Sequence, residues 1–248
     1  MNAISFFNNK GGVGKTTLLC NVAAYLSINN NKRVLVVDAD PQCNSTLYCL
    51  SDETVETLYN KKNRETIKTF IEPVRRGKGY LEERVDPIPS DRFQCDVLPG
   101  DPTLSLSEDL LASDWSAATS GDPRGLATTF VFSHLANQYS EYDYVLFDVG
   151  PTLGAINRAV LIPMSVDIFS LMALNNIVLS LDTWTKHLNR GIEDYNEQHD
   201  DESDSHKFDW ELSFCGYVVQ QYTAKTVRGE REQVKAYENV SRKIPKRM

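Results

Sequence analysis

"NNKGGVGKTT", residues 8–17, separates an apolar stretch at residues 4–7 from an amphipathic pattern that begins at Lys15. Its second half, Gly14-Lys15-Thr16, matches the phosphate-binding loop pattern G-x-x-x-x-G-K-[ST]. The first glycine of that pattern is replaced by Asn9, and a second lysine, Lys10, follows it. Beyond Lys15, apolar residues recur on one face of a helix. The stretch therefore predicts a strand, a phosphate-binding loop and a helix, rather than a glycine-rich turn alone.

The chemistry of such a loop explains its residue types. Glycines let successive backbone N–H groups point inward around a phosphate, in conformations and at distances that side chains would prevent. The N-terminus of the following helix adds partial positive charge. Lys15 would neutralise the β- and γ-phosphates, and the Thr16 hydroxyl would bind Mg²⁺. The predicted nucleotide-binding loop consists of Gly11, Gly12, Val13, Gly14, Lys15, Thr16 and Thr17.

Two apolar runs further along the chain end in carboxylates. "VLVVDADPQ" (residues 34–42) reaches Asp38 and Asp40, and "YVLFDVGP" (residues 144–151) reaches Asp148. The carboxyl ends of parallel strands are where such sheets bind ligands, and aspartates there hold Mg²⁺, often through water. Each aspartate alone is equally consistent with an ordinary strand end or a helix cap. Two such runs beside a glycine loop indicate one site.

The order of the apolar runs predicts the fold. Short apolar runs alternate with longer amphipathic ones, which is typical of βαβ units. We expect an α/β fold, with a mainly parallel twisted sheet flanked by helices on both faces, in a single domain over residues 1–248. Strands are predicted at Ile4–Phe7, Val34–Asp38, Cys95–Leu98, Tyr144–Asp148, Ile168–Met172 and Phe214–Val219, and helices from Lys15, near Thr66, from Ser105, near Arg124, near Ile156, from Asn175 and near Glu230. Residues 73–91 and 198–209 are expected to be irregular.

Composition narrows the class of protein. A hydrophobic content of 41% and a charged content of 24% are typical of a soluble globular protein. No apolar run approaches the ~20 residues of a membrane-spanning helix, and no signal peptide precedes the first strand, so we expect a cytoplasmic protein. Five cysteines without a C-x-x-C pair indicate reduced thiols. His199 and His206 flank the acidic run at 200–205, which we interpret as a solvated loop rather than a metal site.

Charge is spread unevenly along the chain. The net charge of -8 argues against nucleic-acid binding by the surface as a whole. Residues 193–209 hold eight acids and one lysine, whereas residues 225–248 hold eight bases and three acids. A charged run is usually a solvated face, yet the basic end is the one hint of a polyanionic partner in the sequence.

These residues resemble the ParA/Soj/MinD family of deviant-Walker P-loop ATPases. "KGGVGKTT" (residues 10–17) matches the loop of that family, and "DADPQCNST" (residues 38–46) resembles its second motif. "YDYVLFDVGPTLGAINRAVL" (residues 142–161) resembles the third, although Gly150 stands where a proline is usual. The similarity runs from residue 2 to about 240 and specifies the family rather than its cargo. It implies a P-loop NTPase fold that binds ATP and Mg²⁺.

The resemblance also implies three catalytic residues. Lys15 would bind phosphate, and Asp40 would orient the attacking water. Lys10 corresponds to the signature lysine of the family, which crosses a dimer interface to the nucleotide of the partner. Phosphoryl transfer needs positive charge at the γ-phosphate, and a second loop lysine can supply it from another subunit. Lys10 is otherwise an exposed loop lysine without a role.

The remaining site residues follow from the same resemblance. Thr16 would bind Mg²⁺, while Asp38 and Asp148 would support the shell of the metal ion. Gln220 or Gln221, near the last strand of the sheet, would contact adenine.

The same family resemblance implies binding partners for this protein. The family resemblance implies an ATP-dependent homodimer with slow ATP hydrolysis, stimulated by a ParB-like or other activator protein, acting in DNA partition or cargo positioning. Members that bind DNA usually continue past the point where this chain ends, at "SRKIPKRM". The sequence therefore leaves open whether the chain is C-terminally short and whether it binds DNA non-specifically through its basic end, which would place it at the nucleoid. No membrane helix is expected there, because Pro245 interrupts a weakly apolar segment.

Two other functions share this scaffold. An ATP-driven dimer could recruit a protein complex without binding DNA. A metabolic enzyme or reductase is disfavoured, because an iron–sulfur relative needs interface cysteines, and Cys95 is isolated.

Overall fold

The computed structural model describes residues 1–162, 165–168, 171–199, 208, 210, 212, 214–217, 224–227 and 230–233. Seven of the described strands form one sheet in the order β3-β4-β2-β5-β1-β6-β7. All neighbours in it are parallel except the edge pair β3–β4. The strands are β1 (Asn2–Phe7), β2 (Val34–Asp38), β3 (Ile88–Ser90), β4 (Cys95–Leu98), β5 (Tyr144–Asp148), β6 (Ser165–Ile168) and β7 (Phe214–Tyr217). The predicted mainly parallel sheet is confirmed.

The central strands are buried on both faces. Every residue of β2 is buried. Val34 and Val36 pack on one side of the sheet, and Leu35 and Val37 pack on the other. A continuous run of apolar residues is what such a strand requires, since helices cover both of its faces.

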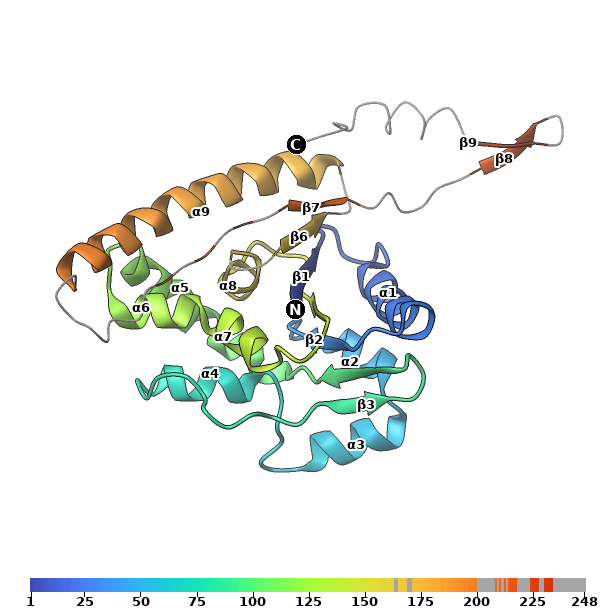
Figure 1. Cartoon of the computed structure of the whole chain (residues 1–248), viewed down its shortest axis with the longest axis horizontal. Helices are drawn as coiled ribbons and strands as arrows, with labels where there is room; N and C mark the ends of the chain where they lie inside the picture. The colour runs from blue at the N-terminus through green and yellow to red at the C-terminus, as the bar shows by residue number, and fades with distance from the viewer. Residues whose placement is uncertain are drawn as a thin grey trace.

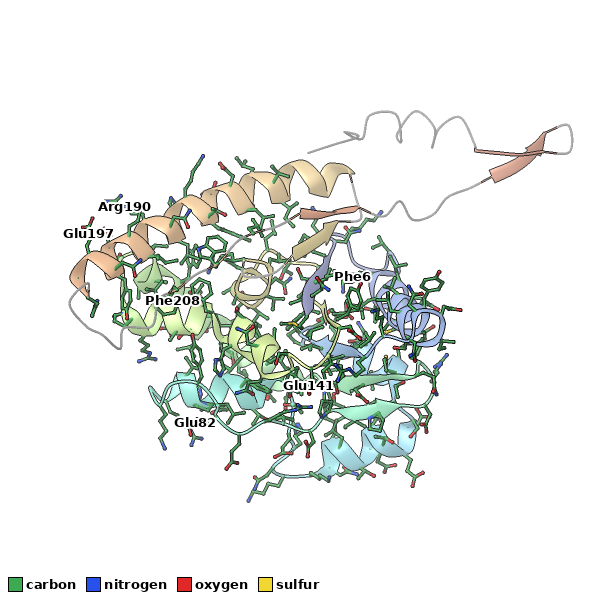
Figure 2. All side chains as sticks on the ribbon, in the orientation of Figure 1. Phe6, Glu82, Glu141, Arg190, Glu197 and Phe208 are labelled. Atoms are coloured by element: carbon green, nitrogen blue, oxygen red, sulfur yellow. The ribbon has the colours of Figure 1, made fainter. Side chains whose placement is uncertain are left out.

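Helices form a layer on each side of the sheet (Figure 1). On one side, α1 packs on β1, where Phe6 is labelled in Figure 2. On the other, α4, α5, α7, α8 and α9 contribute to a larger apolar core. The helices are α1 (Lys15–Asn30), α2 (Asn44–Cys49), α3 (Asp52–Asn60), α4 (Lys68–Arg75), α5 (Glu108–Ala118), α6 (Pro123–Thr129), α7 (Val131–Gln138), α8 (Ala155–Leu161) and α9 (Leu171–Gln198), with a 3-10 helix η1 (Pro102–Ser107). The prediction of helices on both faces is confirmed.

Two predicted elements are wrong. The strand predicted at Ile168–Met172 is β6, which ends at Ile168, and α9 already begins at Leu171. The apolar run across this junction fits a buried strand or a buried helix equally well, and pairing with β1 decides between them. The helix predicted near Glu230 is a strand, β9 (Glu230–Gln233), which pairs antiparallel with β8 (Ala224–Val227). Cross-strand pairing there overrides the helix propensity of its residues.

Several boundaries also differ from the prediction. The helix predicted from Ser105 is preceded by η1, and α5 begins at Glu108. The irregular segment at 73–91 ends in the short edge strand β3. The cysteines whose side chains the structure describes, Cys20, Cys43, Cys49 and Cys95, are free and buried. In the described part of the chain, every helix is too short or too polar to cross a membrane.

Candidate functional site

The glycine loop connects the end of β1 to the start of α1. Gly12 and Gly14 have φ angles of 73° and 84°, in the left-handed region that other residues rarely adopt. Gly14 is the N-cap of α1, and its carbonyl accepts the first helical hydrogen bond, from Leu18 at 2.9 Å. The buried side chain of Asn8 fixes the other limb, since its oxygen accepts a hydrogen bond from the Lys10 N–H at 3.0 Å. The backbone is therefore shaped as a cradle for an anion.

A cavity of about 470 Å³ lies against this loop. All seven predicted loop residues, Lys15 among them, line it together with Lys10 and Asp40, so all three predicted catalytic residues border the cavity. Other lining residues, which the sequence did not single out, are Gln42, Asn44, Tyr48 and Pro151. Gln42 and Asn44 belong to the second motif, so the sequence could have identified them as site residues. Tyr48 of α2 lies outside every motif, so there was no reason in the sequence to expect it there. The loop and the second motif therefore border the same space.

Lys15 and Thr16 both contact Asp148, at the end of β5. The Lys15 ammonium forms an ion pair with one carboxylate oxygen, and the Thr16 hydroxyl donates to the other at 2.8 Å. Asp148 is fully buried, and Lys15 is only 8% exposed. The buried carboxylate of Asp148 thus has one cationic and one hydroxyl partner. These two contacts join the glycine loop to the third motif through side chains.

Asp40 lies at the cavity wall and is nearly buried. Burial raises its pKa, and this effect is partly offset by a hydrogen bond from the Gln42 N–H and by the charge of Lys15. The Gln42 bond measures 3.0 Å and leaves the second carboxylate oxygen for another partner. A carboxylate placed in this way could accept a hydrogen bond from a water molecule in the cavity.

Asp38 is placed differently from Asp40, because its side chain does not line the cavity. Its carboxylate accepts hydrogen bonds from the Thr46 N–H at 2.8 Å, the Thr46 hydroxyl at 2.6 Å and the Asp40 N–H at 3.3 Å. A Cβ atom at Gly100 would approach its carboxyl carbon to 2.9 Å, so the surroundings are tight. Burial and the charge of Asp148 raise the pKa of Asp38 to about 7. In this arrangement Asp38 holds the second motif in shape, and its support of a metal ion remains a prediction.

The third motif continues from Asp148 into a loop that ends at α8. Asn157 of α8 closes this loop, since its amide donates to the carbonyls of Gly150 at 2.7 Å and Thr152 at 2.5 Å. A second chamber of about 310 Å³ adjoins the loop, and Asp40, Gln42 and Pro151 line both spaces. Glu108 of α5, which sequence reasoning missed, also lines this chamber.

The described residues fit a magnesium ion held largely by the nucleotide. No group of three His, Cys, Asp or Glu side chains in the described part of the chain is arranged to hold a metal. The Thr16 hydroxyl next to Asp148 instead offers one protein oxygen with a carboxylate behind it, a set that suits Mg²⁺ bound mainly by phosphates and water. Gln220 and Gln221, predicted at the adenine, lie outside the described residues.

Comparison with known proteins identifies similar chains. A protein-family model described as "AAA domain" matches residues 1–193. Chromosome partitioning protein ParA of Myxococcus xanthus is 30% identical over 196 residues, which is 75% of this chain and 60% of that protein. The chain thus matches less than two thirds of the length of this relative.

Solved structures show the same architecture. A crystal structure of a protein from Corynebacterium diphtheriae is 34% identical, with a TM-score of 0.79, and the match covers 88% of this chain and 83% of that one. Cobyrinic acid a,c-diamide synthase from Mycobacterium smegmatis, solved with ADP and magnesium, has a TM-score of 0.65 over 98% of this chain and 82% of its own. At 18% identity, that second likeness shows the fold alone.

Proposed function

Because this chain belongs to the ParA/MinD family of P-loop ATPases, we propose that it binds ATP with Mg²⁺ and hydrolyses it slowly in an ATP-dependent homodimer. The observation that carries the proposal is the arrangement at the cavity. The loop amides, Lys15, Thr16 and Asp40 all face one space, and Asp148 stands behind two of them. Each group has a part in phosphoryl transfer.

The loop would bind the phosphates through its backbone N–H groups, oriented by the left-handed glycines. Lys15 would exchange part of its contact with Asp148 for the β- and γ-phosphates. Thr16 would hold Mg²⁺, which when bound supplies positive charge to the phosphate oxygens. Asp40 would orient the attacking water, and burial keeps this carboxylate out of bulk solvent.

Lys10 is the residue proposed to act in a second subunit. It is exposed and lines the cavity, five residues before Lys15 in the loop. Its side chain is free to extend toward the nucleotide of a facing copy, where its charge would stabilise the developing charge on the γ-phosphate. Hydrolysis would then require two ATP-bound copies, so turnover would also dissolve the dimer. A ParB-like or other activator protein would stimulate this step.

We further propose a role in DNA partition or cargo positioning, supported by the partitioning ParA relative. The test is made on the full chain with ATP, ADP and a non-hydrolysable ATP analogue. We expect Mg²⁺-dependent hydrolysis, and a dimer in light scattering with ATP or the analogue but not with ADP. A chain that neither hydrolyses ATP nor changes its mass would contradict the proposal.

A salt series on immobilised non-specific DNA then separates the two versions of this function. Retention that requires ATP and falls steeply with salt supports DNA binding, because phosphate contacts release counterions. A dimer that forms with ATP but is not retained supports a switch that recruits a protein complex instead.

A further inference from the structure

Glu108 makes a contact that links α5 to the third motif. It is the first residue of α5, and its carboxylate reaches the N-terminus of α8. One oxygen accepts the Ala155 N–H, and the other accepts the Ile156 N–H at 3.1 Å. The two residues that Glu108 contacts are 47 and 48 positions away in the chain.

This contact replaces a local helix cap. The N-cap residue of α8 is Gly154, which has no side chain to accept a hydrogen bond from the first turn. Free N–H groups at a helix start need partners, and a carboxylate there also interacts favourably with the helix dipole. A Cβ atom at Gly154 would overlap a carboxylate oxygen of Glu108. Glycine at 154 and glutamate at 108 are therefore matched to each other.

The capped helix start follows directly on the loop at residues 150–154, which reaches the wall of the nucleotide cavity. Asn157 ties α8 to the carbonyls of Gly150 and Thr152, so the loop and the helix start form one unit. Gly150 faces the carboxylate of Asp40, which a Cβ atom at 150 would approach to 3.5 Å. Pro151 lines the nucleotide cavity. The placement of this unit thus sets the surface opposite Asp40.

We propose that Glu108 is a positioning residue for ATP hydrolysis: by capping α8 from α5, it holds the loop at residues 150–154 against Asp40. This role rests on the proposed ATPase function. Glu108 does not line the nucleotide cavity, although it lines the adjoining chamber. Its loss should therefore affect the chemical step more than nucleotide binding, because a displaced wall misplaces the groups around Asp40.

The test compares Glu108→Ala, Glu108→Gln and the control Asp109→Ala in the full chain. Asp109 is the next residue of the same helix turn, carries the same charge and is exposed. We expect Glu108→Ala to lower kcat at least ~10-fold, since misplacement by about 1 Å can cost ~100-fold, with the Kd for ADP unchanged within about threefold. Glu108→Gln keeps one carbonyl acceptor and should recover part of kcat, and Asp109→Ala should match wild type.

Hydrogen exchange supplies a readout independent of turnover. Exchange at the Ala155 and Ile156 amides should accelerate in Glu108→Ala, while amides of α1 stay protected as in wild type. The positioning role is overturned if Glu108→Ala keeps kcat within about twofold of wild type, or if kcat and ADP affinity fall together. A wild-type chain without turnover would overturn the ATPase function and with it this role, and exchange would still report whether the cap forms.

Discussion

Lys15 of α1 and Asp148 of β5 form an ion pair in which both side chains are buried, at 9% and 0% exposure. The second oxygen of Asp148 accepts the Thr16 hydroxyl at 2.8 Å. The glycine loop is thereby tied to the third motif. Under the proposed function, a bound phosphate would compete with Asp148 for Lys15, and nucleotide binding would thereby be coupled to the strand end that leads into the loop at residues 150–154.

The pair predicts a non-additive effect of mutation on stability. Lys15→Met leaves the Asp148 carboxylate buried without its cation, so we expect a loss of about 3 kcal/mol in the free energy of unfolding. The double variant Lys15→Met with Asp148→Asn removes both charges and should recover most of that loss. Urea unfolding of the four chains in the cycle measures this. Neither lysine variant should bind ATP, and simple addition of the two single losses would show that the pair is not coupled.

We expect a change at Lys10 to lower ATP turnover without a comparable effect on nucleotide binding. Lys10→Ala removes an exposed charge that lines the cavity. We expect ADP affinity within a few-fold of wild type, while activator-stimulated ATP turnover falls about 100-fold, as is typical when one stabilising group is lost from a transition state. Turnover assays and light scattering with an ATP analogue measure both effects.

Lys32→Ala is the matched control for this experiment, because Lys32 is also exposed but lies after the C-terminal end of α1. The crossing role of Lys10 is excluded if Lys10→Ala turns over ATP as fast as the control.

We expect the stability of the folded chain to depend on pH through the carboxyl group of Asp38. Burial first, and then the charge of Asp148, raise its pKa from the ordinary 3.8 to about 7. A carboxyl whose folded-state pKa is raised binds its proton more tightly in the folded chain than in the unfolded chain. The stabilisation that this proton adds to the free energy of unfolding is therefore full below about pH 4 and is lost as the pH rises through 7. Each unit of pKa difference corresponds to about 1.4 kcal/mol.

Asp38→Asn cannot ionise, so it tests this pH dependence directly. Thermal unfolding between pH 5 and 8 should show wild type losing stability relative to the variant as the pH rises. The variant itself should be less stable at pH 5, because an amide can accept fewer of the hydrogen bonds from Thr46 and Asp40. Parallel pH profiles of the two chains would contradict the raised pKa.

Arg64 and Asp101 form an ion pair, and we expect this pair to stabilise the folded chain. Burial raises the pKa of Asp101, but hydrogen bonds from Arg64 and Thr103 outweigh it and lower the pKa to about 2. Arg64 binds both carboxylate oxygens, at 2.8 and 3.0 Å. Arg64→Ala should cost on the order of 2 kcal/mol at pH 7. Because the folded-state pKa is lowered, this contribution is present above about pH 4 and is lost as the pH falls through 2.

Arg75→Ala is the control for this pair, since the Arg75 side chain is 51% exposed and pairs at 2.9 Å with Glu72, whose side chain is 29% exposed. An exposed pair of this kind contributes about 0.5 kcal/mol or less. Urea titrations of the two variants at pH 7 compare them, and equal losses would count against a special role for Asp101.

The loop and the buried strands were predictable from the sequence because their signals are local. Glycines next to a lysine and a hydroxyl leave few alternatives, and the strands at Val34–Asp38, Cys95–Leu98 and Tyr144–Asp148 have the bounds that their apolar runs predict. The junction between β6 and α9 was not predictable in this way, because its residues suit either element and only the neighbouring strand selects one.

The aspartates show the same division within the site. Their place at the ends of strands followed from the sequence, but the work of each carboxylate depends on which donors the fold brings to it. Asp148 contacts Lys15 and Thr16, whereas Asp38 accepts hydrogen bonds from Thr46. No spacing rule distinguishes these two carboxylates.

By itself, then, the sequence determined the α/β fold and the glycine loop that we propose binds phosphate, because dihedral freedom and apolar periodicity are properties of neighbouring residues. Only the tertiary structure decided that Glu108 caps α8, a contact between residues 47 positions apart. Hydrogen bonds between distant segments arise when packing brings the segments together, so their donors and acceptors carry no mark in the linear chain.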